Sequence, residues 1–548
     1  MTRHHRTRPL SAAATKTSKP ATSQPASGGK PKLRAGILFG VCLLAYLATG
    51  QSEPGNDAAS NVHLPLQLLE HGSVFFTPEE NPRMFRFAVD TPEGRKGTRI
   101  RDWRITYQGQ TVRDAYAKGL IGVDRPMYYL VPTRHPGKYA STFGLGAGLW
   151  ALPVVAPVRA VVSDLASNLD LLWWLGKLAA ALSVAGAVAF LYFAALRASS
   201  PGAAVLVALA YGLGTCVFSI SSQALWQHGP CEFFLAMGAY HLLSKAGKRS
   251  DLLCGLGFAL AVFCRPTSAI VVVCVGGYLL ISDRRRLLWF VVGGLPVAVA
   301  LFGYSQYTFG SLFSFGQLGA GAGVAQVKTG NPGLWQTPLW LGMAGLLVSP
   351  ARGLFVYTPI ALFAAWGVGR AFRDPAWKDL RPLAAAALLL LGLASKWFDW
   401  WGGWCFGYRP IVDLAILLAF LSLPVLGRVA SSKVLKRVFA GLFAYSVGVQ
   451  VLGAVAYDVT GWNNRKVWEV VAPDRTERLS FPDRPTAELF VRDRDGQLET
   501  RALNVDMPEY RQRLWSIVDS PIVYYLSNLS SAIESRGKGV SRFIADEG

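Results

Sequence analysis

Residues 171–196 read LLWWLGKLAAALSVAGAVAFLYFAAL, an apolar run that a single charge interrupts, at Lys177. A helix of about 20 apolar residues crosses the hydrocarbon core of a bilayer. Similar runs occupy residues 202–222 and 287–307. The composition agrees, because 51% of the chain is hydrophobic and 16% is charged, whereas soluble domains are about 25% charged. The sequence therefore predicts an all-α protein that crosses a membrane many times.

The side on which basic loops lie sets the orientation of such a chain, since Lys and Arg are enriched in cytoplasmic loops. The net charge is +21. Residues 1–34 and five connections between predicted spans carry 23 basic and 4 acidic residues, while segments 51–142 and 460–548 are nearly balanced. We therefore predict a cytoplasmic N-terminus and an extracytoplasmic C-terminus. The positive charge then belongs to the membrane surface, not to nucleic acid.

About eleven spans, within a range of nine to thirteen, satisfy this charge pattern. Residues 143–163 are not counted, because as a span they would turn every later basic loop outward. Pro153 and Pro157 also disfavour a straight helix there, so we expect a juxtamembrane or re-entrant segment. Residues 336–349 are set aside for the same reason. The predicted spans lie near residues 35–50, 171–196, 202–222, 229–244, 252–264, 267–282, 287–307, 354–370, 381–396, 410–427 and 438–459.

This topology divides the chain into three regions. Residues 1–34 form a disordered basic tail in the cytoplasm, residues 35–459 form the membrane domain, and residues 460–548 form a small extracytoplasmic region. Within the membrane domain, residues 51–170 make a long first extracytoplasmic loop with juxtamembrane helices. The Ala- and Arg-rich composition points to the plasma (inner) membrane of a bacterium. The seven cysteines are scattered without a CxxC pair, which predicts neither a disulfide framework nor a metal cluster.

Polar and charged residues gather at the predicted outer ends of the spans. Arg265 and Arg409 lie at span breaks, where snorkelling reduces the roughly 2.5–3.5 kcal/mol cost of inserting a charge. Because Arg binds phosphate oxygens with a two-pronged fork, this convergence predicts an anionic ligand at the outer interface. The stretch before Arg409 also holds Asp399, Trp401 and Tyr408, which are candidates for contact with a substrate.

Two interpretations stay open for the aromatic and histidine residues on this face. The tryptophans at 397, 400, 401 and 404 are typical of an interfacial aromatic belt, or they stack against sugar rings. His228 is either a hydrogen-bonded structural residue or a residue near the ligand. The sequence alone does not separate these alternatives.

Asp57 follows the first predicted span and precedes an apolar helical stretch at residues 58–71. Asp is a good helix N-cap, which explains the residue type without any chemistry. A carboxylate at this place is also suited to take the proton of an acceptor hydroxyl as a general base. The two roles are compatible. Glu53 is a reserve candidate in the same segment.

Several segments together resemble a known family, the GT-C superfamily of polytopic glycosyltransferases. The similarity is to its bacterial phospholipid-carrier-dependent branch, which is related to the protein mannosyltransferases and the aminoarabinose transferases. The similar segments keep the family's order between about residues 50 and 425. They are GND at 55–57, LPLQLLEHG at 64–72, KYASTFGLGAGLWALP at 138–153, SSQALWQHGP at 221–230, FCRP at 263–266, VSPARGLF at 348–355 and WWGGWCFGYRP at 400–410.

The resemblance implies a GT-C-like catalytic domain over residues 35–459 that uses a polyprenyl-phosphate sugar as donor. The catalytic acid of the family's first outer loop maps onto Asp57, and a Lys-Pro-Pro-like element maps roughly onto residues 135–138, which makes Lys138 a contact for the donor phosphate. Members often carry two acids where this chain has Asn56 and Asp57, so we assign no metal ligand and no certain cofactor; a divalent metal stays open. The expected partners are the donor, membrane lipids and an extracytoplasmic glycan, lipid or protein acceptor.

The alternative function is a transporter or flippase for a lipid-linked anionic substrate. Such a protein would also use outer basic residues and broken helices. It should show inverted repeats and ionisable residues near the middle of the membrane, whereas the sequence has no clear repeat and its polar groups cluster at one face. An inactive scaffold of the cell envelope is a third alternative.

Overall fold

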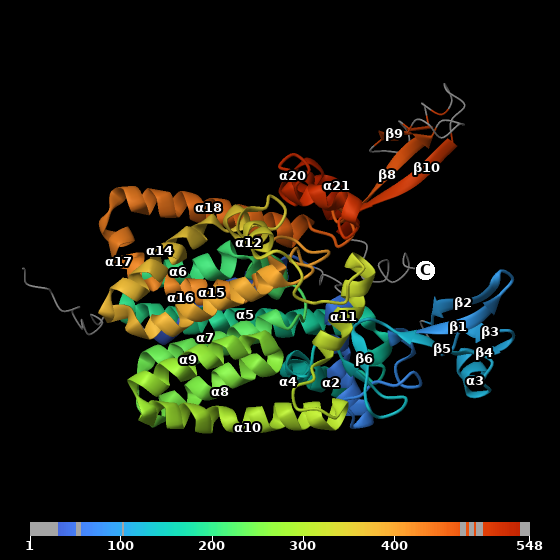
Figure 1. Ribbon diagram of the computed structural model, residues 1–548, viewed down its shortest axis with the longest axis horizontal. Helices are drawn as coiled ribbons and strands as arrows, with labels where there is room; N and C mark the ends of the chain where they lie inside the picture. The colour runs from blue at the N-terminus through green and yellow to red at the C-terminus, as the bar shows by residue number, and fades with distance from the viewer. Residues whose placement is uncertain are drawn as a thin grey trace, which may run out of the picture.

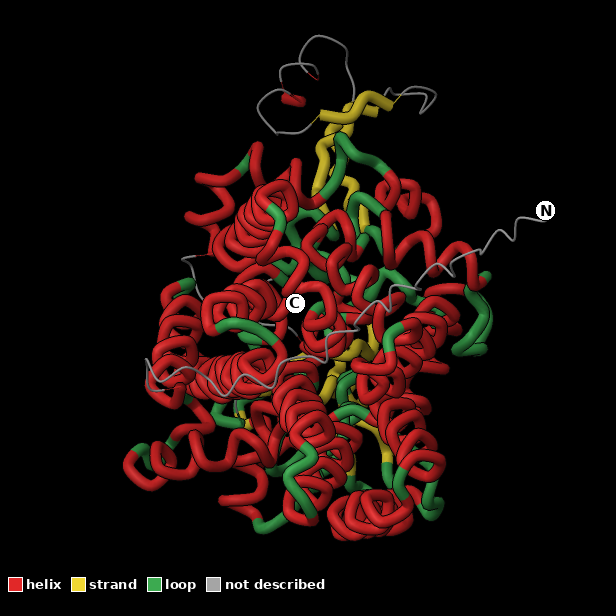
Figure 2. The backbone as a smooth tube through the Cα atoms, turned by 90° about the vertical axis from the view of Figure 1, so that its left-hand side faces the viewer, coloured by secondary structure: helices red, strands yellow, loops and turns green. Residues whose placement is uncertain are grey.

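The computed structural model describes residues 31–50, 56–100, 103–471, 478–481, 487–488, 491 and 497–536. Helices make up most of these residues, as Figure 2 shows. The prediction of a mainly helical protein is therefore confirmed, although small sheets add strands that the all-α prediction did not include. Most of the predicted basic tail, and Glu53, lie outside the described residues.

Among the described residues, four helices are long and apolar enough to cross a bilayer. A fifth span results if α16 (Leu414–Leu421) and α17 (Leu423–Ser431), which are bent by 50°, count as one. The chain is thus a helical protein with four or five candidate membrane spans, and the predicted count of about eleven exceeds this number. The four long helices are α1 (Pro31–Ala48), α5 (Leu169–Ala198), α10 (Arg284–Phe309) and α18 (Lys433–Ala456).

Shorter helices occupy most of the other predicted spans, and local features explain their length. α6 ends at Gly214 because Thr215 is extended and a π-helical turn, Val217–Ser221, follows. α8 ends before Pro266, since the residue that precedes a proline avoids the helical region. The helices run alongside the long ones in Figure 1. They are α6 (Pro201–Gly214), α7 (His228–Ser244), α8 (Lys248–Cys264), α9 (Ala269–Ser282), α14 (Leu362–Arg373) and α15 (Arg381–Lys396).

Helices α8 and α10 approach each other closely through glycine. A Cβ atom on Gly255 would lie 1.8 Å from the carbonyl oxygen of Phe290, and one on Gly293 would lie 2.0 Å from that of Leu252. Each helix therefore presents a glycine to the backbone of the other. Small residues at such crossings allow the close packing that holds membrane helices together.

We expect Gly255→Val to weaken this pair, because the new side chain must push the backbone of α10 away. Overpacking of this kind costs about 1–3 kcal/mol. The midpoint of thermal unfolding in detergent should fall, whereas Gly277→Val in α9, where a Cβ meets nothing within 4 Å, should leave it unchanged. Equal midpoints for both variants would contradict the packing.

Residues 143–163, which we did not count as a span, contain the short helix α4 (Gly146–Val161), which is continuous through both Pro153 and Pro157 and is not among the candidate spans. The two prolines are about one turn apart and both are exposed. The backbone hydrogen bonds that proline cannot donate are therefore missing on the exposed face of the helix. The opposite face packs against α2 (Ala59–His71). Residues 336–349, which were also not counted as a span, contain the short helix α12 (Leu339–Val348). Two more short helices are α11 (Gly316–Thr329) and α13 (Leu354–Tyr357).

The first predicted outer loop contains a small antiparallel sheet with strand order β2-β1-β5. Its central strand alternates between buried Phe85 and Phe87 and more exposed neighbours, which is the two-residue period of a strand. A hairpin of β6 and β7 then returns the chain to α4. The elements are β1 (Phe85–Thr91), β2 (Gly94–Arg99), β3 (Thr106–Tyr107), β4 (Gln110–Thr111), α3 (Val112–Ala117), β5 (Gly122–Pro126), β6 (Leu130–Pro132) and β7 (Tyr139–Ser141).

The region after α18 forms a second antiparallel sheet, with order β10-β8-β9. Its buried Trp462 and Tyr525 belong to the same hydrophobic cluster as the membrane helices, so this region is packed onto the helical body. Both sheets lie at the same end of that body in Figure 1. The elements are β8 (Asn464–Val471), β9 (Arg478–Phe481), β10 (Gln497–Asn504), α20 (Pro521–Ser527) and α21 (Leu529–Arg536).

Candidate functional site

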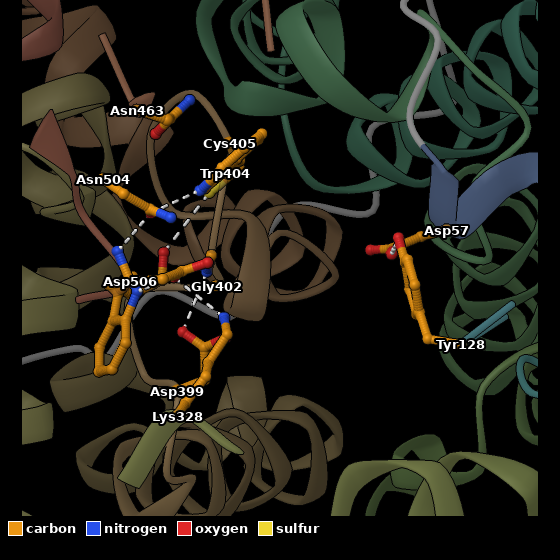
Figure 3. Close-up of polar contacts among 12 residues, drawn as sticks. Asp57, Tyr128, Lys328, Asp399, Gly402, Trp404, Cys405, Asn463, Asn504 and Asp506 are labelled. Carbon is orange, nitrogen blue, oxygen red and sulfur yellow. Dashed lines mark hydrogen bonds and ion pairs between the residues drawn. The ribbon is translucent and has the colours of Figure 1, made fainter. Parts of the chain in front are cut away.

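Asp57 lies in a 3₁₀ turn, Asn56–Ala58, immediately before α2. The N-cap residue of α2 is Ala58, and no side chain caps the helix there. The Asp57 carboxylate instead accepts two hydrogen bonds from distant parts of the chain. The Tyr128 hydroxyl donates to Oδ1 over 2.6 Å, and Arg409 Nη1 donates to Oδ2 over 2.6 Å. Figure 3 shows Asp57 and Tyr128 facing each other. The helix-capping interpretation of Asp57 is therefore not what the structure displays.

Arg409 is held from three sides. Besides its ion pair with Asp57, Nη2 donates to the carbonyl oxygen of Gly402 over 2.6 Å, and the guanidinium lies 4.9 Å from the centre of the Trp226 ring. Burial acts to lower the pKa of Arg409, but the Asp57 carboxylate outweighs it and holds that pKa above its ordinary value. The Arg409 side chain is 17% exposed and that of Asp57 is 24% exposed. A charged pair that is partly open to ligands thus joins residues 352 positions apart.

The position of the Gly402 carbonyl depends on its backbone conformation. Gly402 and Gly403 have φ values of +73° and +63°, which residues with a side chain rarely adopt. A Cβ atom on Gly402 would also lie 2.7 Å from Pro410. These two glycines therefore allow the turn that points a carbonyl oxygen at Arg409.

A second, largely buried charged group includes Asp413, which lies four residues after Arg409 in the sequence. Arg265 forms an ion pair with Asp413, and its Nη2 donates to the carbonyl oxygen of Pro410 over 3.1 Å. His228 Nδ1 lies 2.9 Å from the other carboxylate oxygen of Asp413. The sequence alone did not point to Asp413. Both Arg265 and His228 contact the Asp413 carboxylate, which favours a structural role for His228. The arginine that pairs with Asp57 is Arg409.

Lys138 lies apart from this group. It is exposed in the turn between β6 and β7, and its amine makes no hydrogen bond or ion pair with the described residues. The other end of the same hairpin contacts the segments that carry Asp57 and Tyr128. Ser141 donates to the Ser60 hydroxyl over 2.9 Å, and Thr142 donates to the carbonyl oxygen of Tyr128 over 3.0 Å. Lys138 therefore belongs to the element that frames Asp57 without touching it.

The remaining candidates in the tryptophan loop, which we define as residues 397–408, are mostly buried. The Tyr408 hydroxyl contacts Thr358 and accepts from the backbone N–H of Cys216. The Trp401 side chain is 2% exposed. Asp399 forms an ion pair with Lys328. These three residues build the loop, and none of them is placed as an open substrate contact.

A small cavity of about 30 Å³ lies close to these elements. It is lined mainly by apolar groups from α8, α10, the segment before α11 and the segment after β7, including Phe263, Leu301 and Phe315. Thr142, which hydrogen-bonds the backbone of Tyr128, and Pro266, which follows Arg265, are also in its wall. The buried hydroxyl of Ser305 in this wall has no hydrogen-bond partner among the described residues.

The polar groups around Asp57 do not resemble a metal site. Within the part of the chain that the structure describes, no three His, Cys, Asp or Glu side chains gather closely enough to hold a metal ion. The seven cysteines are all unpaired thiols, and six of them are buried. Among the described residues, the side chains that hydrogen-bond the Asp57 carboxylate are those of Arg409 and Tyr128.

Comparison with known proteins gives no family assignment. No protein-family model matches the chain, and no curated protein sequence matches it. The class that the structure itself defines is a mainly helical protein with four or five candidate membrane spans. The similarity to GT-C transferases stays a resemblance of short segments, and a function inferred from that resemblance is a proposal.

Proposed function

We propose that the protein is a GT-C-like glycosyltransferase in a bacterial plasma membrane, its N-terminus inside and its C-terminus outside. It would move a sugar from a polyprenyl-phosphate donor to an extracytoplasmic glycan, lipid or protein. One observation carries the proposal: the carboxylate of Asp57 and the guanidinium of Arg409 meet at 2.6 Å, with part of each side chain exposed. These are the two groups that such a transfer needs at one point.

The chemistry assigns one task to each group. Asp57 takes the proton from the acceptor hydroxyl while the acceptor oxygen forms a bond to the anomeric carbon of the sugar. The bond between that carbon and the phosphate oxygen breaks, and its electron pair leaves on polyprenyl phosphate. Arg409 stabilises the charge that grows on the leaving phosphate. Before the donor binds, the two groups neutralise each other. The phosphate would compete with Asp57 for Arg409 Nη1, while Nη2 stays on the Gly402 carbonyl oxygen, and this would leave the carboxylate free to accept a proton.

An apolar surface next to the site supports a lipid-linked donor. The residues of this surface line the small cavity and come from α10, which is a candidate span, and from segments that contact the Asp57 site. An isoprenoid chain gains free energy by leaving water for such a surface. The chain of the donor would lie along this apolar surface, with the phosphate directed toward Arg409.

The experiment that tests the proposal uses the purified full chain in detergent with radiolabelled polyprenyl-phosphate sugars, with and without candidate acceptors. We expect the label to leave the lipid fraction in the presence of one donor and acceptor pair. Label that stays on the lipid with every donor and acceptor offered would contradict a transferase.

The alternative of a transporter or flippase has one observation in its favour, the buried charged residues of the helical body. Glu232 in α7 is 0% exposed and accepts hydrogen bonds from Tyr211 and Ser221. Lys177 in α5 is also 0% exposed and donates to Thr49 and Gln223. Ionisable residues inside a membrane domain mark transport paths in many proteins.

Glu232→Gln separates the two functions. Glutamine has the same shape and keeps an oxygen that accepts from Tyr211 or Ser221, but it cannot exchange a proton. If the protein is a transferase, we expect Glu232→Gln to transfer sugar at the wild-type rate. The exposed control Glu509→Gln should also transfer at that rate. If Glu232→Gln instead stops movement of a lipid-linked substrate across proteoliposomes, the transferase proposal is wrong.

A further inference from the structure

A largely buried lysine connects three parts of the chain, one of which is the tryptophan loop that contacts Arg409. Lys328, near the end of α11, lies 2.7 Å from Asp399 in the tryptophan loop and 2.9 Å from Asp506, which follows β10. The three side chains are 18%, 12% and 18% exposed. We call Lys328, Asp399 and Asp506 the lysine bridge; Figure 3 shows them together.

The carboxylates of the lysine bridge also fix the tryptophan loop. Asp399 Oδ1 accepts from the backbone N–H of Gly403 over 3.0 Å, and Asp506 Oδ1 accepts from the indole N–H of Trp401 over 2.9 Å. Burial acts to lower the pKa of Lys328, but the two carboxylates outweigh it and raise that pKa, so the amine stays charged. Each partner of Lys328 therefore holds one side of the turn at Gly402 and Gly403.

Two arginines complete the attachment of this turn. Arg511 lies 4.6 Å from the Trp401 ring and donates to the carbonyl oxygen of Lys328 over 3.0 Å. The fully buried Arg352 donates to the carbonyl oxygens of Trp401 and Gly403 over 2.9 Å and 3.0 Å. Arg352 also donates to Oδ1 of Asn463, which follows α18, over 2.8 Å. It therefore joins the loop to the region after α18 by charge-assisted hydrogen bonds, which are stronger than neutral ones.

The turn has one contact that leads to the candidate site. The carbonyl oxygen of Gly402 accepts from Arg409 Nη2, and Arg409 Nη1 donates to Asp57. A continuous series of contacts therefore runs from Lys328 through Asp399, Gly403 and Gly402 to Arg409. A shift of the turn would move the oxygen that orients the guanidinium.

We propose that Lys328, Asp399 and Asp506 are positioning residues, which hold the Gly402–Gly403 turn so that Arg409 points at Asp57. The region after α18 then helps to position Arg409, because it supplies Asp506. The catalytic meaning of this arrangement rests on the proposed function. The mechanical link between the lysine bridge and the tryptophan loop does not, and it can be tested by itself.

Cys405 offers a reporter for that link, since it lies inside the tryptophan loop and is 3% exposed. In the full chain in detergent, Lys328→Met should raise the rate at which a maleimide labels Cys405 by about tenfold or more, because the loop opens locally. The single variant Lys328→Arg keeps the charge, so its Cys405 should label as slowly as in the wild-type chain. The exposed control Lys466→Met on β8 should also show the wild-type labelling rate. Peptide mapping identifies Cys405, and slow labelling of buried Cys254 shows that the helical body remains folded.

Asp506→Asn is the second variant, in case Lys328→Met does not fold. It keeps an oxygen for the Trp401 indole and removes only the charge that pairs with Lys328. Faster labelling of Cys405, with Cys254 still protected, supports the proposal. Wild-type labelling of Cys405 in both folded variants would overturn it.

The kinetic consequence is measured with the donor that the wild-type chain uses. Misplacing Arg409 should lower kcat by about 10- to 100-fold, with recovery in Lys328→Arg. Normal kcat in a variant whose Cys405 is exposed would overturn the positioning role and leave the proposed function intact. If the wild-type chain transfers no sugar, the proposed function fails, while the labelling experiment still decides the mechanical link.

Discussion

Asp57→Asn is expected to lower the rate of sugar transfer by about 10²–10⁴-fold, the usual contribution of a general base. Asparagine has nearly the same shape as aspartate and keeps an oxygen that can accept from the Tyr128 hydroxyl. It cannot take the proton of an acceptor hydroxyl. The measurement is the initial rate of transfer at saturating donor, normalised to the amount of folded protein in detergent.

The matched control for this variant is Asp124→Asn, an exposed carboxylate on β5 in the same predicted loop. It should transfer sugar at the wild-type rate. If Asp57→Asn also transfers within about threefold of wild type, a loss far below that expected for a general base, Asp57 is not the base and the assignment falls.

Arg409→Met is expected to lower kcat by about 10²–10³-fold, the cost of removing one donor that stabilises transition-state charge. Arg409→Lys should recover part of the rate at most. A lysine amine is a single point charge, whereas the guanidinium contacts Asp57 and the Gly402 carbonyl at once through separate nitrogens. The measurement is kcat and the donor KM for both variants.

Arg437→Met at the exposed start of α18 is the control for the loss of one positive charge. It should leave kcat and KM unchanged. Because Arg409→Met also leaves the Asp57 carboxylate without its partner, part of any loss of stability should disappear in the double variant Asp57→Asn/Arg409→Met. A wild-type kcat in Arg409→Met would remove arginine from the proposed mechanism.

The ion pair of Asp57 and Arg409 was predicted from the sequence only in part. Sorting the basic loops by side placed both residues at one face of the membrane, and the segments that resemble GT-C proteins include both. That is a statement about a face, not about a contact. The direct ion pair across 352 positions depends on how the helices pack, which no local pattern encodes.

Other residues of the site left weaker signals. Asp413 lies within a predicted apolar span, where a charge is costly, and that cost could have marked it as the partner of a buried arginine. Tyr128 and Asp506 lie in polar segments where their residue types are ordinary. Their roles come from contacts with Asp57 and Lys328 that only the folded chain creates.

The number of spans was the least predictable feature of the fold. Hydropathy locates apolar stretches, but it does not show where a helix ends inside one. The extended Thr215 after α6 divides a stretch that looks continuous in composition, whereas the break at Arg265-Pro266 could be predicted from the sequence. Conversely, the prolines of α4 do not end that helix, because both lie on its exposed face.

The most direct test of the central claim traces the label of a polyprenyl-phosphate sugar in proteoliposomes that contain the full chain and an external acceptor. We expect labelled acceptor and an equal amount of released polyprenyl phosphate with the wild-type protein, and neither product with Asp57→Asn. Donor that crosses the bilayer unchanged, at the same rate in both proteins, would contradict the assignment of a transferase.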